Sequence, residues 1–131
     1  MENKFKLTIM TPDKEFFNGE VVKLNSEDSD GRFGILPNHS SIVSDLIPTV
    51  TSFQDINNKE FHCFTSNGVI KIKNNVVVMI CDAAEWPEEI DKDRATAAKI
   101  RAEERLKEKE KIDIKRAENA LKRSLVRLKL S

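Results

Sequence analysis

The sharpest constraint on the fold is a change in residue usage at Trp86, the last aromatic residue of the chain. Residues 87–131 are crowded with charged residues and alanine instead. Because a compact core needs large apolar side chains, these two parts of the chain cannot be built in the same way. We therefore expect a globular domain over residues 1–86 and a helical appendage over residues 87–131.

The first part of the appendage has the spacing of an amphipathic helix. Residues on one side recur at steps of three and four, the period of an α-helix, and a row of arginines runs beside them. The first row is Asp91, Ala95, Ala98, Ala102 and Leu106, and the second is Arg94, Arg101 and Arg105. This pattern predicts one helix with a cationic edge.

The end of the chain repeats this arrangement. An apolar stripe at helical spacing is accompanied by three arginines that fall within about 40° of each other on a helical wheel. The stripe is Ile114, Ala117, Leu121, Leu125 and Leu128, and the arginines are Arg116, Arg123 and Arg127. The pattern predicts a second amphipathic helix.

The two stripes do not lie along one side of a single straight helix. An unbroken helix would rotate the stripe by roughly 100° between Leu106 and Ala117. We therefore predict a break within residues 109–113, with Asp113 as the N-cap of the second helix, and an antiparallel hairpin. No Gly or Pro enforces the break, so the segment can also straighten. Because alanine buries little apolar area, we expect the hairpin to be held weakly and to move.

Residues 1–86 have the pattern of short β-strands. Apolar and polar side chains alternate over residues 4–9, as in a half-buried strand. Asn18-Gly19 predicts a hairpin turn before a returning strand at 21–24. Residues 26–39 are polar and turn-rich, and their glycines indicate positive φ or close backbone approach. Further strands are expected within 48–53, 61–65, 69–73 and 76–80. About eight to ten strands without a helix predict a β-sandwich or flattened barrel, so the fold class is mainly β with a C-terminal helical hairpin.

Composition excludes several classes of protein. The 22 basic and 22 acidic residues among 131 cancel, so the chain lacks a net field for nucleic acid or an anionic membrane. Its longest apolar run, residues 76–81, is far shorter than the roughly 20 residues of a membrane-spanning helix. The chain opens directly into a strand-like pattern without a signal or transit peptide. We therefore expect a soluble protein made where it works.

Side chains for a catalytic or metal centre are also missing. Cys63 and Cys81 sit among apolar neighbours and are expected to be buried free thiols in a reducing compartment. His39 and His62 lack partners at metal-ligand spacing, so no metal site is expected. The sequence has neither a Walker phosphate loop nor a nucleophile elbow. These observations predict that the protein is not an enzyme.

One cluster of residues, at the junction between the two parts of the chain, has the side chains needed to bind a ligand. Arg94 and Arg101 are two helical turns apart with small side chains between them, so their guanidinium groups are spaced to bind phosphates. Glu85 and Asp91 are candidates to accept hydrogen bonds from a base or ribose. Folding the hairpin would bring arginines of the second helix to the same place. The whole cluster is Glu85, Ile90, Asp91, Arg94, Arg101, Arg123 and Arg127.

A simpler interpretation of the same charges is open. Arg101 with Glu104, and Glu118 with Lys122, have the spacing of ordinary helical ion pairs, each worth about a few tenths of a kcal/mol. On physical grounds alone, a solvated charged face is the favoured interpretation.

Three short motifs occur along the chain. They are Gly34-Ile35-Leu36-Pro37-Asn38-His39, Asp82-Ala83-Ala84-Glu85 and Ile90-Asp91-Lys92-Asp93-Arg94-Ala95. Their order, their spacing and the length of the chain resemble the epsilon subunit family of rotary F-type ATP synthases, called delta in mitochondria. The third motif is similar to the family's (Ile or Leu)-Asp-x-x-Arg-Ala pattern, which binds ATP in some bacterial members. The resemblance covers nearly the whole chain.

This resemblance implies a sandwich of about ten strands over residues 1–86 and a regulatory two-helix hairpin over residues 87–131. The sandwich would lie at the foot of the central stalk of a proton-translocating ATP synthase, where it couples the gamma subunit to the c-ring. The compact hairpin would permit ATP hydrolysis. Extended along gamma into the alpha/beta head, it would block hydrolysis.

The resemblance also implies a non-catalytic subunit that requires no cofactor and takes ATP as a regulatory ligand. It would reach the membrane only through the complex, at the cytoplasmic face of a bacterial cell membrane or the stromal face of a thylakoid membrane.

Two sets of residues carry over from the family. Those implied to bind ATP are Glu85, Ile90, Asp91, Arg94, Ala95, Arg101, Arg123 and Arg127, the last two through a one-residue gap. Those implied to contact the rotor are Arg32, Gly34, Ile35, Leu36, Pro37 and His39. The chain departs from the family in this second region, because Arg32 stands near a turn where an acidic residue is common and Ser40-Ser41 replaces Ala-Pro.

Without the resemblance, the residues predict a β-sandwich adaptor whose charged hairpin docks on another protein. RNA is a weaker alternative, because the glutamates interleaved with the arginines would repel a polyanion and the tail has no aromatic residue for base stacking.

Overall fold

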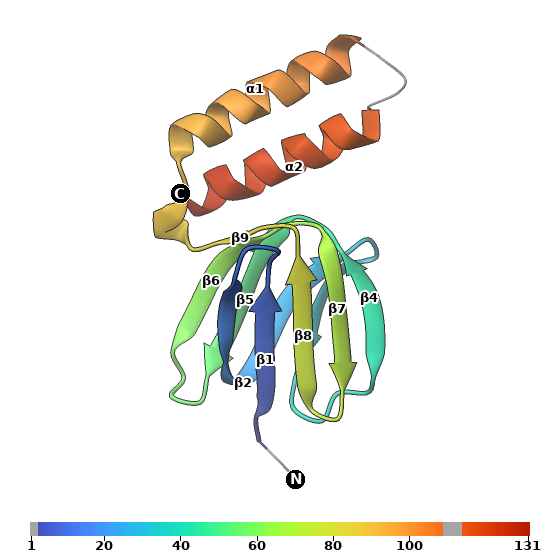
Figure 1. Ribbon diagram of the computed structural model, residues 1–131, viewed down its shortest axis with the longest axis vertical. Coiled ribbons are helices and arrows are strands. Elements are labelled where there is room, and N and C mark those ends of the chain that lie inside the picture. Colours follow the sequence, from blue (N-terminus) through green and yellow to red (C-terminus); the bar gives the residue numbers. More distant parts are fainter. Residues whose placement is uncertain (1–2, 109–113) are drawn as a thin grey trace.

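The computed structural model describes residues 3–108 and 114–131, and it places a β domain beneath a two-helix hairpin (Figure 1). The strands are β1 (Phe5–Met10), β2 (Glu15–Asp28), β3 (Gly31–Ile35), β4 (Ile42–Leu46), β5 (Thr49–Asp55), β6 (Glu60–Thr65), β7 (Gly68–Lys73), β8 (Val76–Cys81) and β9 (Ala84–Glu85). A short 3-10 helix, η1 (Pro87–Glu89), leads into α1 (Lys92–Glu108) and α2 (Ile114–Leu130). The predicted fold class is thereby confirmed. The predicted break and its cap at Asp113 lie outside the described residues.

The β domain is a flattened barrel because one long strand, β2, belongs to both of its layers. The first half of β2 pairs with β1, and β1 also pairs in parallel with β8. Beyond Val21, β2 pairs with β3 on one side and β5 on the other. The strand order β1-β8-β7-β4 returns to β2 where Leu46 meets Asp28, which closes the ring.

The core lies between these two layers and is made by the inward side chains of alternating strand positions. It includes Phe5, Leu7, Ile9, Val21, Leu24, Phe53, Ile70, Val77 and Met79. Both cysteines are buried and free, as predicted. Trp86 stacks on Phe16 with 4.4 Å between ring centroids, so the end of the β domain is fixed directly before the hairpin begins.

A chain of three buried hydroxyl groups runs along one layer, from β2 through β5 to β6. The Ser26 and Thr51 hydroxyl oxygens lie 2.9 Å apart, and those of Thr51 and Thr65 lie 2.7 Å apart. Each hydroxyl satisfies its neighbour away from water, so the three strands are held in one register.

The hairpin turn predicted at Asn18-Gly19 was wrong. Both residues lie inside β2, where Gly19 pairs with Leu7 of β1. The chain turns earlier, where the Thr11 amide donates to the Lys14 carbonyl at 2.9 Å. A Cβ at Gly19 would lie 3.0 Å from the tip of the Phe17 ring, so a side chain there would require a small shift of that ring.

The stretch at 26–39 is more regular than predicted. It contains the end of β2 and all of β3, and β4 after it was not anticipated. Gly31 has a φ of 128°, and a Cβ on Gly34 would lie 3.0 Å from the Asn25 side chain. These two glycines therefore serve the two purposes expected of them, positive φ and close approach.

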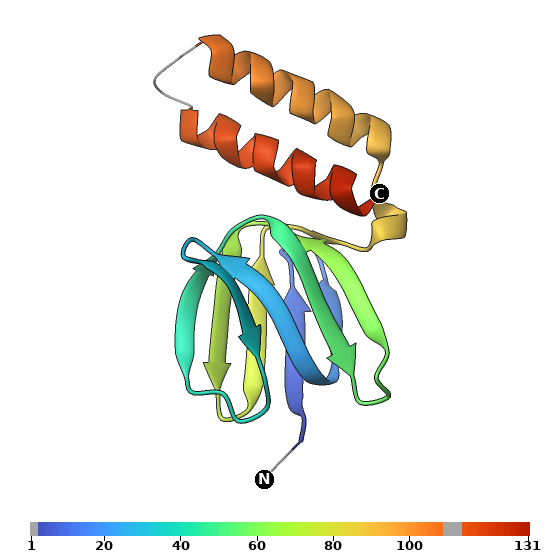
Figure 2. The same cartoon turned by 180° about the vertical axis from the view of Figure 1, so that it is seen from behind.

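The hairpin covers one end of the barrel, with α2 between α1 and the strands (Figures 1 and 2). The single buried stripe predicted for the second helix was wrong, because Leu125 is 45% exposed while Ser124 and Val126 are buried. The reason is that α2 has two packing partners. One side packs against α1 through small residues such as Ala117, and another side packs on the barrel through Val126.

The seam between α2 and the barrel is incompletely filled. Beside it runs an open groove of about 620 Å³ lined by residues of β2, β3, β5, β6 and α2, including Glu27, Arg32, Val50, His62 and Leu125. Phe64, which points out of the barrel on β6, is covered on this side and has no exposed surface. The hairpin therefore rests on the barrel through a small number of contacts.

Candidate functional site: an arginine-lined cleft

The two helices enclose a cleft formed by two adjoining cavities of about 310 Å³ and about 240 Å³. Ala98, Arg101 and Arg127 line both. The larger cavity lies toward η1 and is also lined by Glu85, Glu89, Asp91, Arg94 and Ala95. The smaller lies between the helices and is also lined by Ala102, Arg105, Arg116, Ala117, Ala120, Arg123 and Ser124. The alanines of the predicted stripes thus form the floor of a cleft whose walls are arginines.

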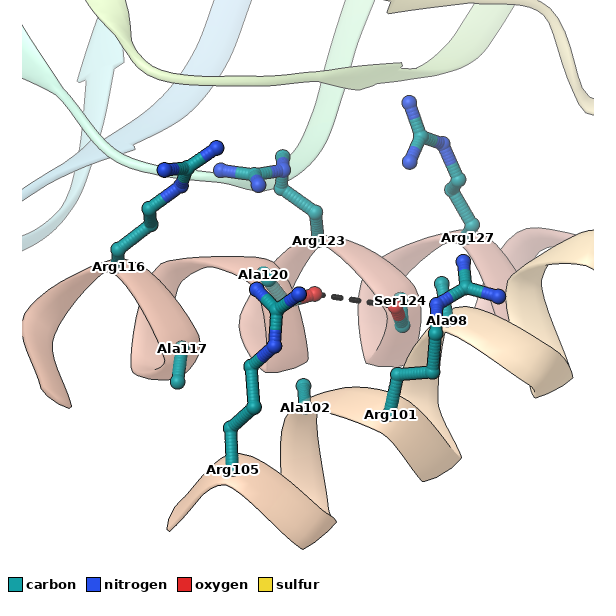
Figure 3. A pocket seen from close by; sticks show the side chains of 10 residues that line it. All are labelled: Ala98, Arg101, Ala102, Arg105, Arg116, Ala117, Ala120, Arg123, Ser124 and Arg127. Carbon is teal, nitrogen blue, oxygen red and sulfur yellow. Dashed lines mark hydrogen bonds between the residues drawn. The ribbon is translucent and has the colours of Figure 1, made fainter. Parts of the chain in front are cut away.

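Figure 3 shows how the guanidinium groups are arranged. Arg101 and Arg105 reach from α1 across α2, and Arg116, Arg123 and Arg127 extend from α2 toward the strands. The smaller cavity is therefore bounded by five cations.

Most of this charge is not paired with a carboxylate in the part of the chain that the structure describes. Of the arginines in the two cavities, only Arg127 forms an ion pair with a carboxylate of residues 3–108 or 114–131. The helical pairs Arg101–Glu104 and Glu118–Lys122, which the sequence left open, do not form. Burial, followed by the neighbouring Arg127, lowers the pKa of the Arg123 guanidinium, and Asp82 partly offsets this. An anion entering the cleft would relieve this repulsion.

Arg127 is held from two sides. Its Nη2 donates to Glu85 Oε2 at 2.6 Å, and its Nε donates to the same oxygen at 3.0 Å. Its guanidinium carbon lies 4.3 Å from the centroid of the Phe64 ring. The last turns of α2 are therefore fastened to β6 and β9 through one side chain.

Asp91 has a local structural role as well as a place in the cleft. Its Oδ1 accepts a hydrogen bond from the Arg94 amide at 3.1 Å, which makes it the N-cap of α1. Its carbonyl accepts from the Ala95 amide at 3.0 Å. The cap fixes the first turn of α1 and hence the starting position of the Arg94 and Arg101 row.

The structure assembles most of the residues that the sequence assigned to ATP. Six of the eight line the larger cavity: Glu85, Asp91, Arg94, Ala95, Arg101 and Arg127. Arg123 lines the smaller cavity, and Ile90 lines neither. Arg105 and Arg116 were not assigned to the site, although they belong to the predicted arginine rows. The sequence did not show that they line the cleft, because this depends on how the two helices pair.

The residues assigned to rotor contact do not form one surface. Leu36 is 61% exposed, and its loop lies at the end of the barrel away from the hairpin, where the Asn38 amide donates to the Asn75 side chain at 2.8 Å (Figure 2). The Ile35 side chain is buried in the core. Arg32 lies at the hairpin side, where it donates to Thr49 and to the Val50 carbonyl.

The chain is thus a two-part protein, a β-barrel followed by a helical hairpin with an arginine-lined cleft. The family described as ATP synthase, Delta/Epsilon chain, beta-sandwich domain matches residues 4–87, and ATP synthase, Delta/Epsilon chain, long alpha-helix domain matches residues 88–131. The chain belongs to this delta/epsilon chain family of ATP synthases. The resemblance drawn from its three motifs is thereby confirmed.

Relatives in clostridia match the chain over almost its full length. The ATP synthase epsilon chain of Clostridium novyi (strain NT) is 49% identical over 130 residues, covering 99% of this chain and 99% of the relative. That of Clostridium botulinum (strain Okra / Type B1) is 48% identical, covering 99% of this chain and 98% of the relative.

Solved structures share the fold at lower identity. A chain of the Euglena gracilis mitochondrial ATP synthase superposes with a TM-score of 0.84 at 20% identity, covering 95% of this chain and 79% of that chain. A chain of the Tetrahymena thermophila mitochondrial ATP synthase central stalk and c-ring superposes with a TM-score of 0.56 at 16% identity, covering 68% and 71%. In the part of the chain that the structure describes, neither helix has the length and apolar content to cross a membrane.

Proposed function

We propose that this protein is a non-catalytic subunit of the central stalk of an ATP synthase, and that its hairpin binds ATP in the compact state as a regulatory ligand. The observation that carries the second part is the arginine-lined cleft. Arg101, Arg105, Arg116 and Arg123 all line it without a carboxylate partner among the described residues. Guanidinium groups in this arrangement suit a polyphosphate.

In this proposal the nucleotide spans the two cavities. The triphosphate lies among the arginines between the helices, and the nucleoside lies toward Asp91, Arg94 and Ala95 at the start of α1. Ile90 lines neither cavity, so this proposal gives it no contact with the nucleotide.

Binding would control the position of the hairpin because the cleft exists only when α1 and α2 lie side by side. A ligand favours the conformation in which its site is formed, so ATP favours the compact hairpin. The incompletely filled seam beneath α2 supports a hairpin that can leave the barrel. Once extended along gamma into the alpha/beta head, it would inhibit ATP hydrolysis.

The barrel would provide the contacts with the rotor. The loop that carries Leu36, Pro37 and His39 is proposed to face the c-ring, at the end opposite the hairpin. The outer face of the β1-β8-β7-β4 layer exposes apolar side chains, of which Val43 is 71% exposed, and this face is proposed to pack on gamma. The chain would reach the membrane only through these partners, at the cytoplasmic face of a bacterial cell.

Titration calorimetry of the isolated protein with ATP tests the proposed ligand. We expect binding by the native chain and loss of at least about tenfold in affinity for Arg123→Gln, which removes a charge-assisted contact. Lys115→Gln is the matched control, because Lys115 is an exposed cation of α2 that lines neither cavity. If the native chain does not bind ATP at millimolar concentration, the regulatory part of the proposal is wrong.

A further inference from the structure

Phe64 and Glu85 form a seat for Arg127 that depends on strand pairing. The two residues are directly opposed in the antiparallel pair of β6 and β9. Opposed residues project to the same face of a sheet, so the ring and the carboxylate stand side by side. The Arg127 guanidinium contacts both, although it comes from the last helix of the chain.

We propose that Glu85 and Phe64 are positioning residues that orient Arg127 toward the nucleotide phosphates, and that Glu85 does not recognise the base. This inference rests on the proposed function, and it assigns Glu85 a role different from the one that the sequence suggested.

The hydrogen bonds of Glu85 support this assignment. Both of its carboxylate oxygens accept from Arg127, at 3.3 Å for Oε1 and 2.6 Å for Oε2. The two side chains are each about a quarter exposed, which strengthens the pair relative to one in open solvent. The charge of the carboxylate is thereby neutralised by its partner, and Oε2 accepts two hydrogen bonds from it.

Phe64 restricts the same guanidinium from its other side. A planar guanidinium lying over a ring keeps one orientation, whereas an ammonium would not be oriented. Because Nε and one N–H of Nη2 face Glu85, the donors of Arg127 that remain for a ligand are the two N–H groups of Nη1 and the second N–H of Nη2. The seat thereby decides which edge of Arg127 meets a phosphate.

Two probes separate orientation of Arg127 from recognition of the base. ATP carries a base, and inorganic tripolyphosphate does not. If Glu85 acts through Arg127, Glu85→Gln weakens both probes by the same factor, about tenfold. If Glu85 reads the base, Glu85→Gln weakens ATP and leaves tripolyphosphate unchanged, which would overturn the inference.

A double-mutant cycle measured with ATP provides the second test. We expect Arg127→Gln to lower the affinity for ATP by the same factor as Glu85→Gln. The double variant should bind ATP no more weakly than either single variant, because both changes disrupt the same Glu85–Arg127 pair. Additive losses would overturn the inference. If tripolyphosphate binds too weakly to measure, the double-mutant cycle is a sufficient test of the inference by itself.

The conservative variants complete the design. Phe64→Leu keeps an apolar side chain and is expected to weaken both probes, whereas Arg127→Lys should not rescue binding. Thermal melts confirm that each variant is folded. Absence of ATP binding by the native chain would instead refute the proposed function, so the two failures are distinguishable.

Discussion

Arg127 and Glu85 are 42 residues apart in the sequence, yet Nη2 and Oε2 lie 2.6 Å apart, so the end of α2 and the edge strand β9 form one hydrogen-bonded unit. The hairpin is otherwise held by limited packing over an incompletely filled seam. This pair is therefore one of the specific contacts that hold the hairpin on the barrel.

Arg127→Gln should loosen the docked hairpin even without nucleotide. Removing one partner of a partly buried charged pair costs about 1 to 3 kcal/mol, because the Glu85 carboxylate is left unpaired. Hydrogen exchange of the α2 amides should accelerate by about tenfold or more, while exchange in the barrel stays unchanged. Lys129→Gln on the same helix is the control, and equal acceleration in both variants would contradict the prediction.

Thr51→Val should destabilise the barrel because Thr51 bridges the hydroxyls of Ser26 and Thr65. The two outer hydroxyls would lose their shared partner in a site without water, at a cost of about 1 to 3 kcal/mol. Urea unfolding followed by Trp86 fluorescence measures the loss. Ser52→Ala, on the opposite side of β5, should change the free energy of unfolding by less than about 0.5 kcal/mol.

Gly68→Ala should be more harmful than Gly19→Ala. A Cβ at Gly68 would lie 2.1 Å from the Ile80 carbonyl oxygen, so the paired strands β7 and β8 would have to separate. At Gly19 the nearest atom is the far end of the Phe17 ring at 3.0 Å, which can rotate. We expect a loss of about 3 kcal/mol or more for Gly68→Ala and about 1 kcal/mol for Gly19→Ala, measured by urea unfolding. A reversed order would contradict this account of the glycines.

The buried thiols should make the barrel less stable in alkali. Burial raises the pKa of the Cys81 thiol to about 12, and burial, followed by the nearby Cys81, raises the pKa of Cys63 as well. In the unfolded chain both thiols ionise near about pH 8.5. Their contribution is therefore complete below that pH and is lost as the pH rises toward 12.

Urea midpoints between pH 7 and pH 10 test this. A Cys63→Ala/Cys81→Ala variant should show a flatter decline than the native chain, whatever its stability at pH 7. The chain has no tyrosine to complicate this range. Identical slopes would show that other groups govern the alkaline loss.

Deletion of residues 92–131 should leave a folded barrel and raise ATP hydrolysis by the assembled synthase, if the hairpin is inhibitory. The barrel closes on its own core between the two layers, and no described residue of α1 or α2 belongs to that core. Steady-state hydrolysis with the deleted and the full-length chain measures the effect. Unchanged hydrolysis with a folded barrel would remove the inhibitory role.

The sequence predicted what depends on local pattern and missed what depends on partners. Alternation at residues 4–9 found β1, and the arginine rows marked both helices. Asn18-Gly19 was mistaken for a turn because the turn signal is local, whereas pairing of Gly19 with Leu7 is not. Burial of Ser124 in place of Leu125 depends on α2 having two neighbours.

For the candidate site too, the sequence predicted what depends on local pattern and missed what depends on long-range contacts. Its cations were found from helical spacing, because three- and four-residue steps are set by the backbone. The pairing of Glu85 with Arg127 could not be found, since nothing in the sequence brings β9 to the end of the chain. The contact between Phe64 and Arg127 depends on the same long-range placement.

The phenyl ring of Phe64 is shielded from solvent only while α2 lies above it, because the ring projects outward from β6 and not into the main core. Releasing the helices would expose this ring to water, which costs about 1.5 to 3 kcal/mol of free energy for an aromatic side chain. A solitary copy of the protein should consequently remain closed. The open form would then occur only in the assembled ATP synthase, where a neighbouring subunit covers the Phe64 ring that α2 exposes when it moves away.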